Sequence, residues 1–137
     1  MANIVFNKIT IEGNSKSIIN LLRVVKSEFY DFDPRRICEF YAESKNESIV
    51  YNARITDCSP DIDYAENQEI CIIYAETAWI LPELEVKILT LLFPDLKITD
   101  VFKSLDNKYQ GFFIYQNGVE IESVCEDYKW DDEEVTK

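Results

Sequence analysis

The chain has 137 residues, of which 47% are hydrophobic and 13% aromatic, and this composition is typical of one folded domain. Fourteen Lys and Arg stand against 26 Asp and Glu, so the formal charge is −12, and there is no histidine. This balance disfavours direct binding to nucleic acid or an anionic membrane, and the missing imidazole removes the commonest general base and metal ligand. We therefore expect a basic protein partner, and no cofactor, metal or enzymatic activity.

The cysteines and the N-terminal residues indicate the cellular compartment in which the protein is expected. The four cysteines form no C-x-x-C pair and stand far apart: Cys38, Cys58, Cys71 and Cys125. They favour buried small side chains with free thiols over disulfides or a zinc site. No apolar run reaches the ~20 residues of a membrane-spanning helix. Residues 1–8 carry neither a secretory signal nor a lipidation motif, so we expect the protein in the cytoplasm.

The first third of the chain predicts a strand, a helix and a less regular stretch. Residues 4–11 alternate as a strand, with one face formed by Val5, Ile9 and Ile11. Asn14 and Ser15 supply an N-cap for a helix of about four turns, whose buried stripe comprises Ile18, Leu21, Leu22, Val25 and Phe29. Residues 35–48 include a short helix around Ile37, Phe40 and Tyr41.

The middle of the chain predicts a hairpin and a second helix. Residues 48–58 alternate as a strand, and the turn-rich segment 59–63 leads into a central strand. This strand is apolar on both faces, with Ile70, Ile72 and Tyr74 on one and Cys71, Ile73 and Ala75 on the other. Pro82 suits the first turn of a helix that Pro94 ends, and its predicted buried stripe is Leu84, Ile88, Leu91 and Leu92.

Three strands are predicted in the last third, over residues 97–102, 109–115 and 119–124. Asn117-Gly118 favours a type I′ turn between the last two, because both residues tolerate positive φ. The resulting order is β-α-β-β-α-β with an extra C-terminal β-hairpin, which indicates a ferredoxin-like α+β sandwich with an antiparallel sheet. We assign residues 1–130 to this single domain and residues 131–137 to an acidic, disordered tail.

Two short motifs resemble the YubB ferredoxin-like domain family, whose members are small proteins found mainly on plasmids, phages and prophages. The first is MAN at residues 1–3 with NKITIEG at 7–13. The second is ETAW at 76–79, followed by Pro82, Phe93-Pro94-Asp95 and the Gly-containing aromatic strand 109–113. The chain departs from the family at two places. At residues 50–53 it reads VYNA, without the Trp and Gly that the family usually carries before the central strand. After Trp79 it has Ile80-Leu81, where the family favours a small polar N-cap. The resemblance implies the fold and a mobile-element origin, and no catalytic residues.

The acidic C-terminal stretch is the leading candidate site. It combines carboxylates with two aromatic side chains, as many protein interfaces do. Four consecutive carboxylates could also mimic the phosphates that a nucleic-acid-binding protein recognises, whereas the alternative is a solubilising tail. The predicted partner-binding residues are Glu126, Asp127, Tyr128, Trp130, Asp131, Asp132, Glu133 and Glu134.

Two further patterns have structural alternatives. Glu76 stands close to Trp79 in the sequence, and a carboxylate beside an indole is a candidate for acid–base chemistry. No second catalytic group is identifiable nearby, so the favoured interpretation is that Glu76 faces solvent while Trp79 seals the core. The strand 110–115 resembles the aromatic strand of ferredoxin-like RNA-binding domains. It lacks the basic residue at its head and follows the second helix, so core packing is the favoured interpretation.

Three functional hypotheses follow. The first is a small acidic, non-enzymatic protein of phage or plasmid origin that acts by protein–protein contact in the host cytoplasm. In its sharpest form it inhibits a nucleic-acid-binding or defence complex such as a CRISPR effector. The second is a carboxylate-dependent small-ligand binder or enzyme that uses Glu76 or the Asp61/Asp63 loop in a concave pocket. The third is a homo-oligomeric module, for instance a homodimer, that buries an open sheet face.

Overall fold

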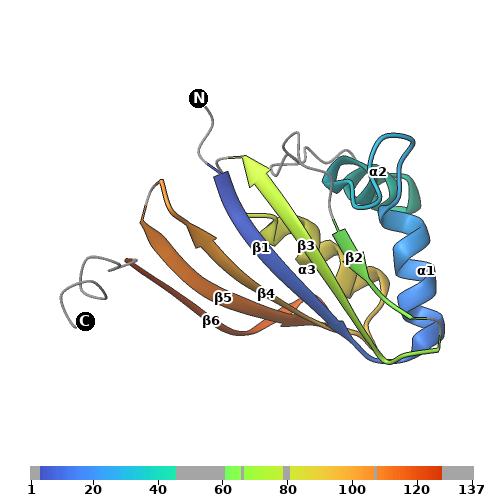
Figure 1. Ribbon diagram of the computed structural model, residues 1–137. Coiled ribbons are helices and arrows are strands. Elements are labelled where there is room, and N and C mark those ends of the chain that lie inside the picture. The colour runs from blue at the N-terminus through green and yellow to red at the C-terminus, as the bar shows by residue number, and fades with distance from the viewer. Residues whose placement is uncertain (1–3, 46–60, 66, 79–80, 107, 128–137) are drawn as a thin grey trace.

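The structure, a computed structural model, describes residues 4–45, 61–65, 67–78, 81–106 and 108–127 (Figure 1). Within these ranges the elements are β1 (Ile4–Glu12), α1 (Ser15–Val25), α2 (Pro34–Lys45), β2 (Asp61–Asp63), β3 (Ile70–Ala78), α3 (Glu83–Leu92), β4 (Lys97–Ser104), β5 (Tyr109–Gln116) and β6 (Val119–Asp127). The strands form one sheet in the order β2-β3-β1-β4-β5-β6, and all neighbours are antiparallel. The predicted α+β class with an antiparallel sheet is confirmed.

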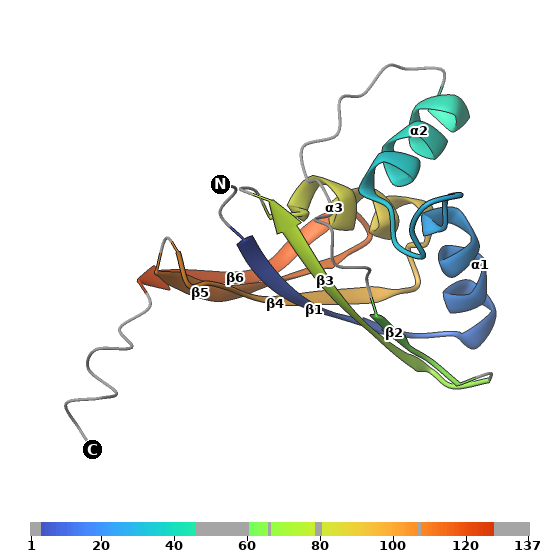
Figure 2. The same cartoon turned by 45° about the horizontal axis from the view of Figure 1, so that its top comes forward.

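The helices lie on one face of the sheet, and no described element covers the other (Figure 2). We call this uncovered side the open face. Helix α1 packs against β3, α3 packs against β4 and β5, and α2 packs against both other helices. The strand alternation sorts side chains between the two faces as predicted, and those fully buried under the helices include Val5, Ile9, Ile11, Cys71, Ile73 and Ile98.

Helix α1 begins as predicted and ends earlier. The Asn14 side chain accepts a hydrogen bond from a backbone N–H of the first turn at 2.8 Å. The helix ends at Val25, and the prediction that Phe29 continues its buried stripe is wrong, since Phe29 is 79% exposed. The chain turns between Ser27 and Tyr30 and places Phe32 in the core instead.

The region between α1 and β3 differs most from the prediction. Helix α2 is twelve residues long and replaces the short helix predicted there. Strand β2 covers residues 61–63, so the prediction of a turn over these residues is wrong, and residues 59 and 60 lie outside the described ranges. Ile62 pairs with Ile73 and is half-buried, while its neighbours Asp61 and Asp63 are exposed. The alternation of polar, apolar and polar residues at 61–63 was the sequence signal for this strand. The strand predicted at 48–58 lies outside the described residues.

Helix α3 follows Pro82 as predicted, but its buried stripe is rotated. Ile88 is buried, whereas the predicted Leu91 is exposed. Glu85, Val86 and Leu89 take fully buried positions that the prediction did not assign to them. The reason is tertiary: α3 packs against α2 as well as against β5, so its interior side differs from that of a helix lying on the sheet alone.

The β5–β6 hairpin confirms the predicted turn. Asn117 and Gly118 have φ values of 53° and 73°, and a type I′ turn requires positive φ at both positions. Helix α3 holds the hairpin at two points. The Gly118 N–H donates to Thr90 Oγ1 at 3.0 Å, and the Tyr115 hydroxyl donates to Glu83 Oε2 at 2.7 Å. Strand β6 lies beyond these anchors, and all nine of its residues are exposed.

The cysteine prediction is confirmed in part. Cys38 and Cys71 are buried free thiols. Burial raises the pKa of Cys38 to about 12 and that of Cys71 to about 11, so both stay protonated near neutral pH and are poor nucleophiles. Cys125 is exposed, which corrects the expectation of burial, because β6 extends past the helix layer. Cys58 lies outside the described residues.

Candidate functional site

The open face displays its side chains in cross-strand rows. The strand registers define a central row that runs from β3 to β6 through Tyr74, Lys8, Val101, Phe112 and Val124. Tyr74 is 45% exposed and Val101 is 50% exposed. Single exposed apolar residues are ordinary, but a row of them on one face is typical of a contact surface.

The next row on the open face has a carboxylate at each of its two ends. It runs through Glu76, Phe6, Lys103, Gln110 and Glu126. Asp61 and Asp63 of β2 add negative charge on the Glu76 side, and Glu122 of β6 adds it on the opposite side. We call these two sides the β2–β3 edge and the β6 edge. The open face is therefore an apolar centre with lysines between two acidic edges.

A pocket of about 240 Å³ lies at the β2–β3 edge. Two aromatic side chains, Phe6 and Tyr74, line it together with two carboxylate side chains, Asp61 and Glu76. Phe6 lies opposite Glu76, and Tyr74 lies opposite Asp61, so the lining comes from three neighbouring strands. Aromatic faces and carboxylates both attract cations, so this lining favours a positively charged group.

The floor of the pocket is the paired backbone of β1 and β3 at Asn7 and Ala75. Both side chains are buried on the helix side of the sheet. The Asn7 amide nitrogen donates to the Ala75 carbonyl at 3.2 Å and to Thr77 Oγ1 at 3.1 Å. These bonds cross from one strand to the other and hold the register of the backbone that forms the pocket floor.

The structure places only part of the predicted C-terminal site. Glu126 and Asp127 lie at the end of β6 and are exposed. Glu126 belongs to the open face and accepts a hydrogen bond from Gln110 at 3.5 Å, whereas Asp127 pairs with Tyr109 in the adjacent register position. Tyr128, Trp130, Asp131, Asp132, Glu133 and Glu134 lie outside the described residues, as does the predicted tail.

The structure brings together two carboxylates that the sequence left apart. Glu76 is half-buried in the pocket lining, and Trp79 lies outside the described residues. Asp61 joins Glu76 in that lining, although the two residues are 15 positions apart in the chain. Asp63 sits one row further along the same edge. The aromatic partners Phe6 and Tyr74 were not predicted as site residues. The available signal was that Phe6 alternates with the predicted buried positions Val5, Ile9 and Ile11, which places it on the opposite face.

The aromatic strand β5 divides between the two faces. Phe113 and Tyr115 are buried under the helices, as the core-packing interpretation predicts. Phe112 lies on the open face in the central row. Two lysines of the same face, Lys8 and Lys103, come from β1 and β4, and their proximity could not be seen from a sequence in which they stand far apart.

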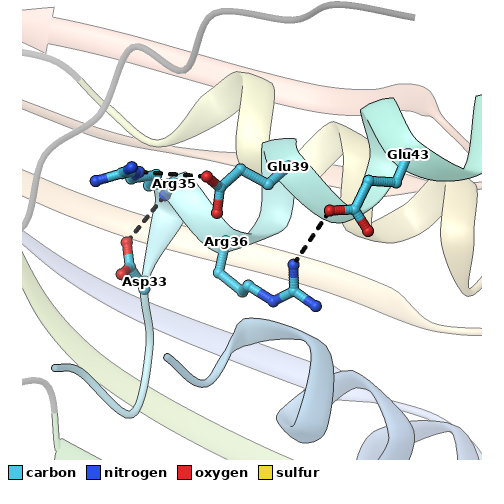
Figure 3. A network of polar contacts seen from close by, with 5 residues as sticks. All are labelled: Asp33, Arg35, Arg36, Glu39 and Glu43. Carbon is cyan, nitrogen blue, oxygen red and sulfur yellow. Dashed lines mark hydrogen bonds and ion pairs between the residues drawn. The ribbon is translucent and has the colours of Figure 1, made fainter. Parts of the chain in front are cut away.

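The arginines of α2 form no basic patch, because the same helix supplies their partners (Figure 3). Arg35 Nε lies 3.4 Å from Glu39 Oε2, and Arg36 Nη1 lies 3.9 Å from Glu43 Oε1. Asp33 Oδ1 also accepts a hydrogen bond from the Arg35 backbone N–H at 3.0 Å. Such exposed pairs contribute only about 0–1 kcal/mol each to stability, but they offset the positive charge of the helix.

Two buried acids lie under the helices, away from the open face. Asp100 is fully buried between Ile9 and Phe113 in its row, and neither carboxyl oxygen has a hydrogen-bond partner among the described residues. Burial raises the pKa of Asp100 well above its usual value. Glu85 is also fully buried, and its Oε2 accepts from the Cys38 thiol at 4.0 Å. These groups belong to the core.

Metal and membrane features can be stated only for the described part of the chain. Among those residues, no three Cys, Asp or Glu side chains gather in a cluster that could hold a metal ion. None of the described helices combines the length and the apolar character needed to cross a bilayer.

The fold and the comparison with known families agree. A sheet with helices on one face, and a match to a ferredoxin-like family model, define the chain as a ferredoxin-like domain. The matching family is described as the ferredoxin-like domain in Api92-like protein, and its model matches residues 60–137 of the chain. This is more than half of the chain, so the chain belongs to that family. No curated protein and no solved structure matches it.

Proposed function

We propose that this chain is a non-catalytic binding domain that docks a basic protein on its open face. The arrangement of that face is the observation that supports this, because an apolar centre lies between two acidic edges. Buried apolar side chains in the middle of an interface provide affinity, and a charged rim selects and steers a partner of opposite sign. The formal charge of −12 extends this attraction beyond contact distance.

The charge also separates this partner from two others. A second copy of the chain would bring another net charge of −12 against the same acidic edges. Nucleic acid would find Lys8 and Lys103 at the centre of the face, but carboxylates flank them on both sides. Like charges across an interface are strongly unfavourable, so a basic protein suits this surface better than a homodimer or a nucleic acid.

The resemblance to the YubB family supports a sharper form of the proposal. In this form the chain comes from a phage or plasmid and acts in the host cytoplasm on a nucleic-acid-binding or defence complex, such as a CRISPR effector. The basic groove of such a complex would attract the acidic edges as it attracts phosphates. The sequence continues the acidic character of the β6 edge through residues 131–134.

A small-ligand site is the second candidate function, and one observation favours it. Asp61 and Glu76 line one pocket, which is the geometry that a carboxylate-dependent site requires. The pocket lies on a sheet face that no described element covers, however, and catalysis generally benefits from excluding water. The pocket therefore suits binding better than chemistry.

Site-specific crosslinking tests the proposal. A photoreactive amino acid at Val101, in the centre of the open face, should crosslink to a basic protein in cells that make the chain. The same amino acid at Asn20, exposed on α1, is the matched control and should give no such product. Equal products from both positions would contradict the proposal, as would a product at Val101 that consists of nucleic acid or of a second copy of the chain.

A further inference from the structure

We infer that the pocket at the β2–β3 edge accepts the guanidinium group of an arginine side chain presented by the docked protein. This inference rests on the proposed function and adds the chemistry by which the partner is recognised. The lining of Phe6, Tyr74, Asp61 and Glu76 combines two aromatic rings with two carboxylates, and arginine is the side chain that uses both at once.

The spacing of the aromatic residues favours a flat group. Phe6 lies opposite Glu76, and Tyr74 precedes Glu76 by two residues on the same strand, so Phe6 and Tyr74 are diagonal neighbours. Diagonal residues in antiparallel sheets have Cα atoms about 7–8 Å apart and Cβ atoms somewhat closer, so two side chains that stand upright on the sheet are spaced similarly. A planar group in contact with a side chain on either side needs about 3.5–4.0 Å to each of them. The two requirements agree for a guanidinium plane.

The carboxylates complete the match. A guanidinium carries five N–H donors in its plane and none above or below it. When its faces lie against aromatic side chains, its edge remains available to Asp61 and Glu76, which provide acceptors from β2 and β3. A lysine ammonium has no flat face to stack, and a neutral ligand would leave the two negative charges uncompensated. Arginine is therefore the better occupant.

Two lysines limit the strength of this site. Lys8 lies opposite Tyr74, and Lys103 lies opposite Phe6, so both border the pocket on the β4 side without lining it. Their charge opposes an incoming cation. The bound arginine therefore enters from the β2 side, where Asp61 and Asp63 dominate the charge. Removing the positive charge of Lys8 should strengthen binding.

The pocket is continuous with the docking surface of the proposed partner. Tyr74 both lines the pocket and begins the central apolar row that leads to Val101. An arginine in the pocket would thus anchor one end of an interface that extends across the sheet. Arginine and tyrosine are enriched at the few positions that dominate binding energy in protein interfaces.

A titration with a defined probe tests the inference on the purified chain. The probe is N-acetyl-arginine methylamide, and the comparison probes are the corresponding lysine compound and the neutral, nearly isosteric citrulline compound. Backbone amide shifts in the NMR spectrum report where each probe binds. We expect saturable shifts at the paired residues 6–8 and 74–76, with the arginine probe binding about tenfold more tightly than the citrulline probe.

Two charge-neutralising variants provide a matched pair. Glu76→Gln and Glu126→Gln remove one carboxylate each from opposite ends of the same cross-strand row. Glu76→Gln should weaken binding of the arginine probe about tenfold, whereas Glu126→Gln should change it less than about twofold. Lys8→Gln should strengthen it. Unchanged amide spectra away from each substitution show that the variants are folded.

The outcomes separate the inference from the proposed function. Equal binding of the arginine and citrulline probes, or equal weakening by both glutamate variants, would overturn the arginine pocket. A crosslink at Val101 would still support the docking surface in that case. Loss of the crosslink together with specific arginine binding would overturn the docking surface and leave a small-molecule site.

Discussion

The two edges of the sheet are both acidic, yet they differ in what supports them. At the β2–β3 edge, β3 lies between β1 and β2, and α1 packs behind it. At the β6 edge, one strand extends beyond the helix layer and is exposed on both sides. The first edge forms a pocket from side chains of three strands. The second edge presents charge on a strand that, among the described elements, pairs with β5 alone.

This comparison shows that negative charge alone does not define a binding site. Both edges place carboxylates on the open face, and the sequence directed attention to the β6 edge because its acidic run is longer. Recognition of one particular group also requires rigid walls at a suitable spacing. Among the described residues, only the β2–β3 edge combines carboxylates with two aromatic side chains over a floor held by hydrogen bonds.

The largest expected effect is the loss of a buried side chain from β5, compared with the loss of an exposed one from β6. Phe113→Ala should destabilise the fold by about 3–5 kcal/mol, because it leaves a cavity under α3. Val124→Ala on β6 should cost less than about 0.5 kcal/mol, since Val124 is exposed. Chemical denaturation of both variants measures the difference. Similar losses would show that β6 contributes to the core as much as β5 does.

A second variant addresses how β6 attaches to β5. A Cβ atom at Gly111 would overlap the Val124 carbonyl oxygen and come within 2.9 Å of the Phe102 ring. Gly111→Ala should therefore destabilise the chain by about 1–3 kcal/mol, because backbone cannot yield as a flexible side chain can. Hydrogen exchange should rise mainly in β6. A uniform rise across all strands would contradict a separable β6 edge.

A third variant concerns the middle of the sheet, between the two edges. Burial raises the pKa of Asp100 in the folded state above its value in the unfolded chain. The stability that the protonated carboxyl contributes is therefore fully present below the unfolded pKa and is lost as pH rises through the folded pKa. Asp100→Asn removes this ionisation. Near neutral pH it should stabilise the chain by about 1.4 kcal/mol for each unit by which burial raises the pKa, because the amide has no charged form for burial to penalise.

The pH dependence checks the sign of that effect. Near pH 3, below the ordinary aspartate pKa of about 3.9, the wild type and Asp100→Asn should have similar free energies of unfolding. Urea denaturation across this range gives the comparison. A stability difference that shrinks as pH rises would show that the carboxylate is stabilised by its surroundings instead.

The smallest expected effect concerns the anchored end of the hairpin. Thr90→Val removes the acceptor of the Gly118 N–H and should cost about 0.5–1.5 kcal/mol. Thr90→Ser keeps the hydroxyl and is the matched control. Thermal denaturation should rank the wild type and Thr90→Ser above Thr90→Val. A loss in Thr90→Ser with no loss in Thr90→Val would point to the Thr90 methyl group instead of the hydrogen bond.

Local patterns predicted much of the fold. The alternation in β1, the Asn14 cap and the Asn117-Gly118 turn depend on neighbouring residues, and the structure confirms all of them. Strand β3 was predicted to be apolar on both faces, but Ile70 and Tyr74 are exposed on the open face. The errors arise where packing between distant segments decides. Phe29 is left out of the core because α1 ends at Val25 and the chain turns, and Leu91 is exposed because α3 packs against α2 as well as against β5.

The sequence by itself determined the α+β class, the antiparallel sheet, the closing hairpin and the negative charge, since these follow from periodicity, turn chemistry and composition. Only the tertiary structure decided which side chains share a surface. Phe6, Asp61, Tyr74 and Glu76 come from three strands and meet because β1 and β2 both pair with β3. Register between strands depends on the whole sheet, so a pocket built across strands cannot be read from any one of them.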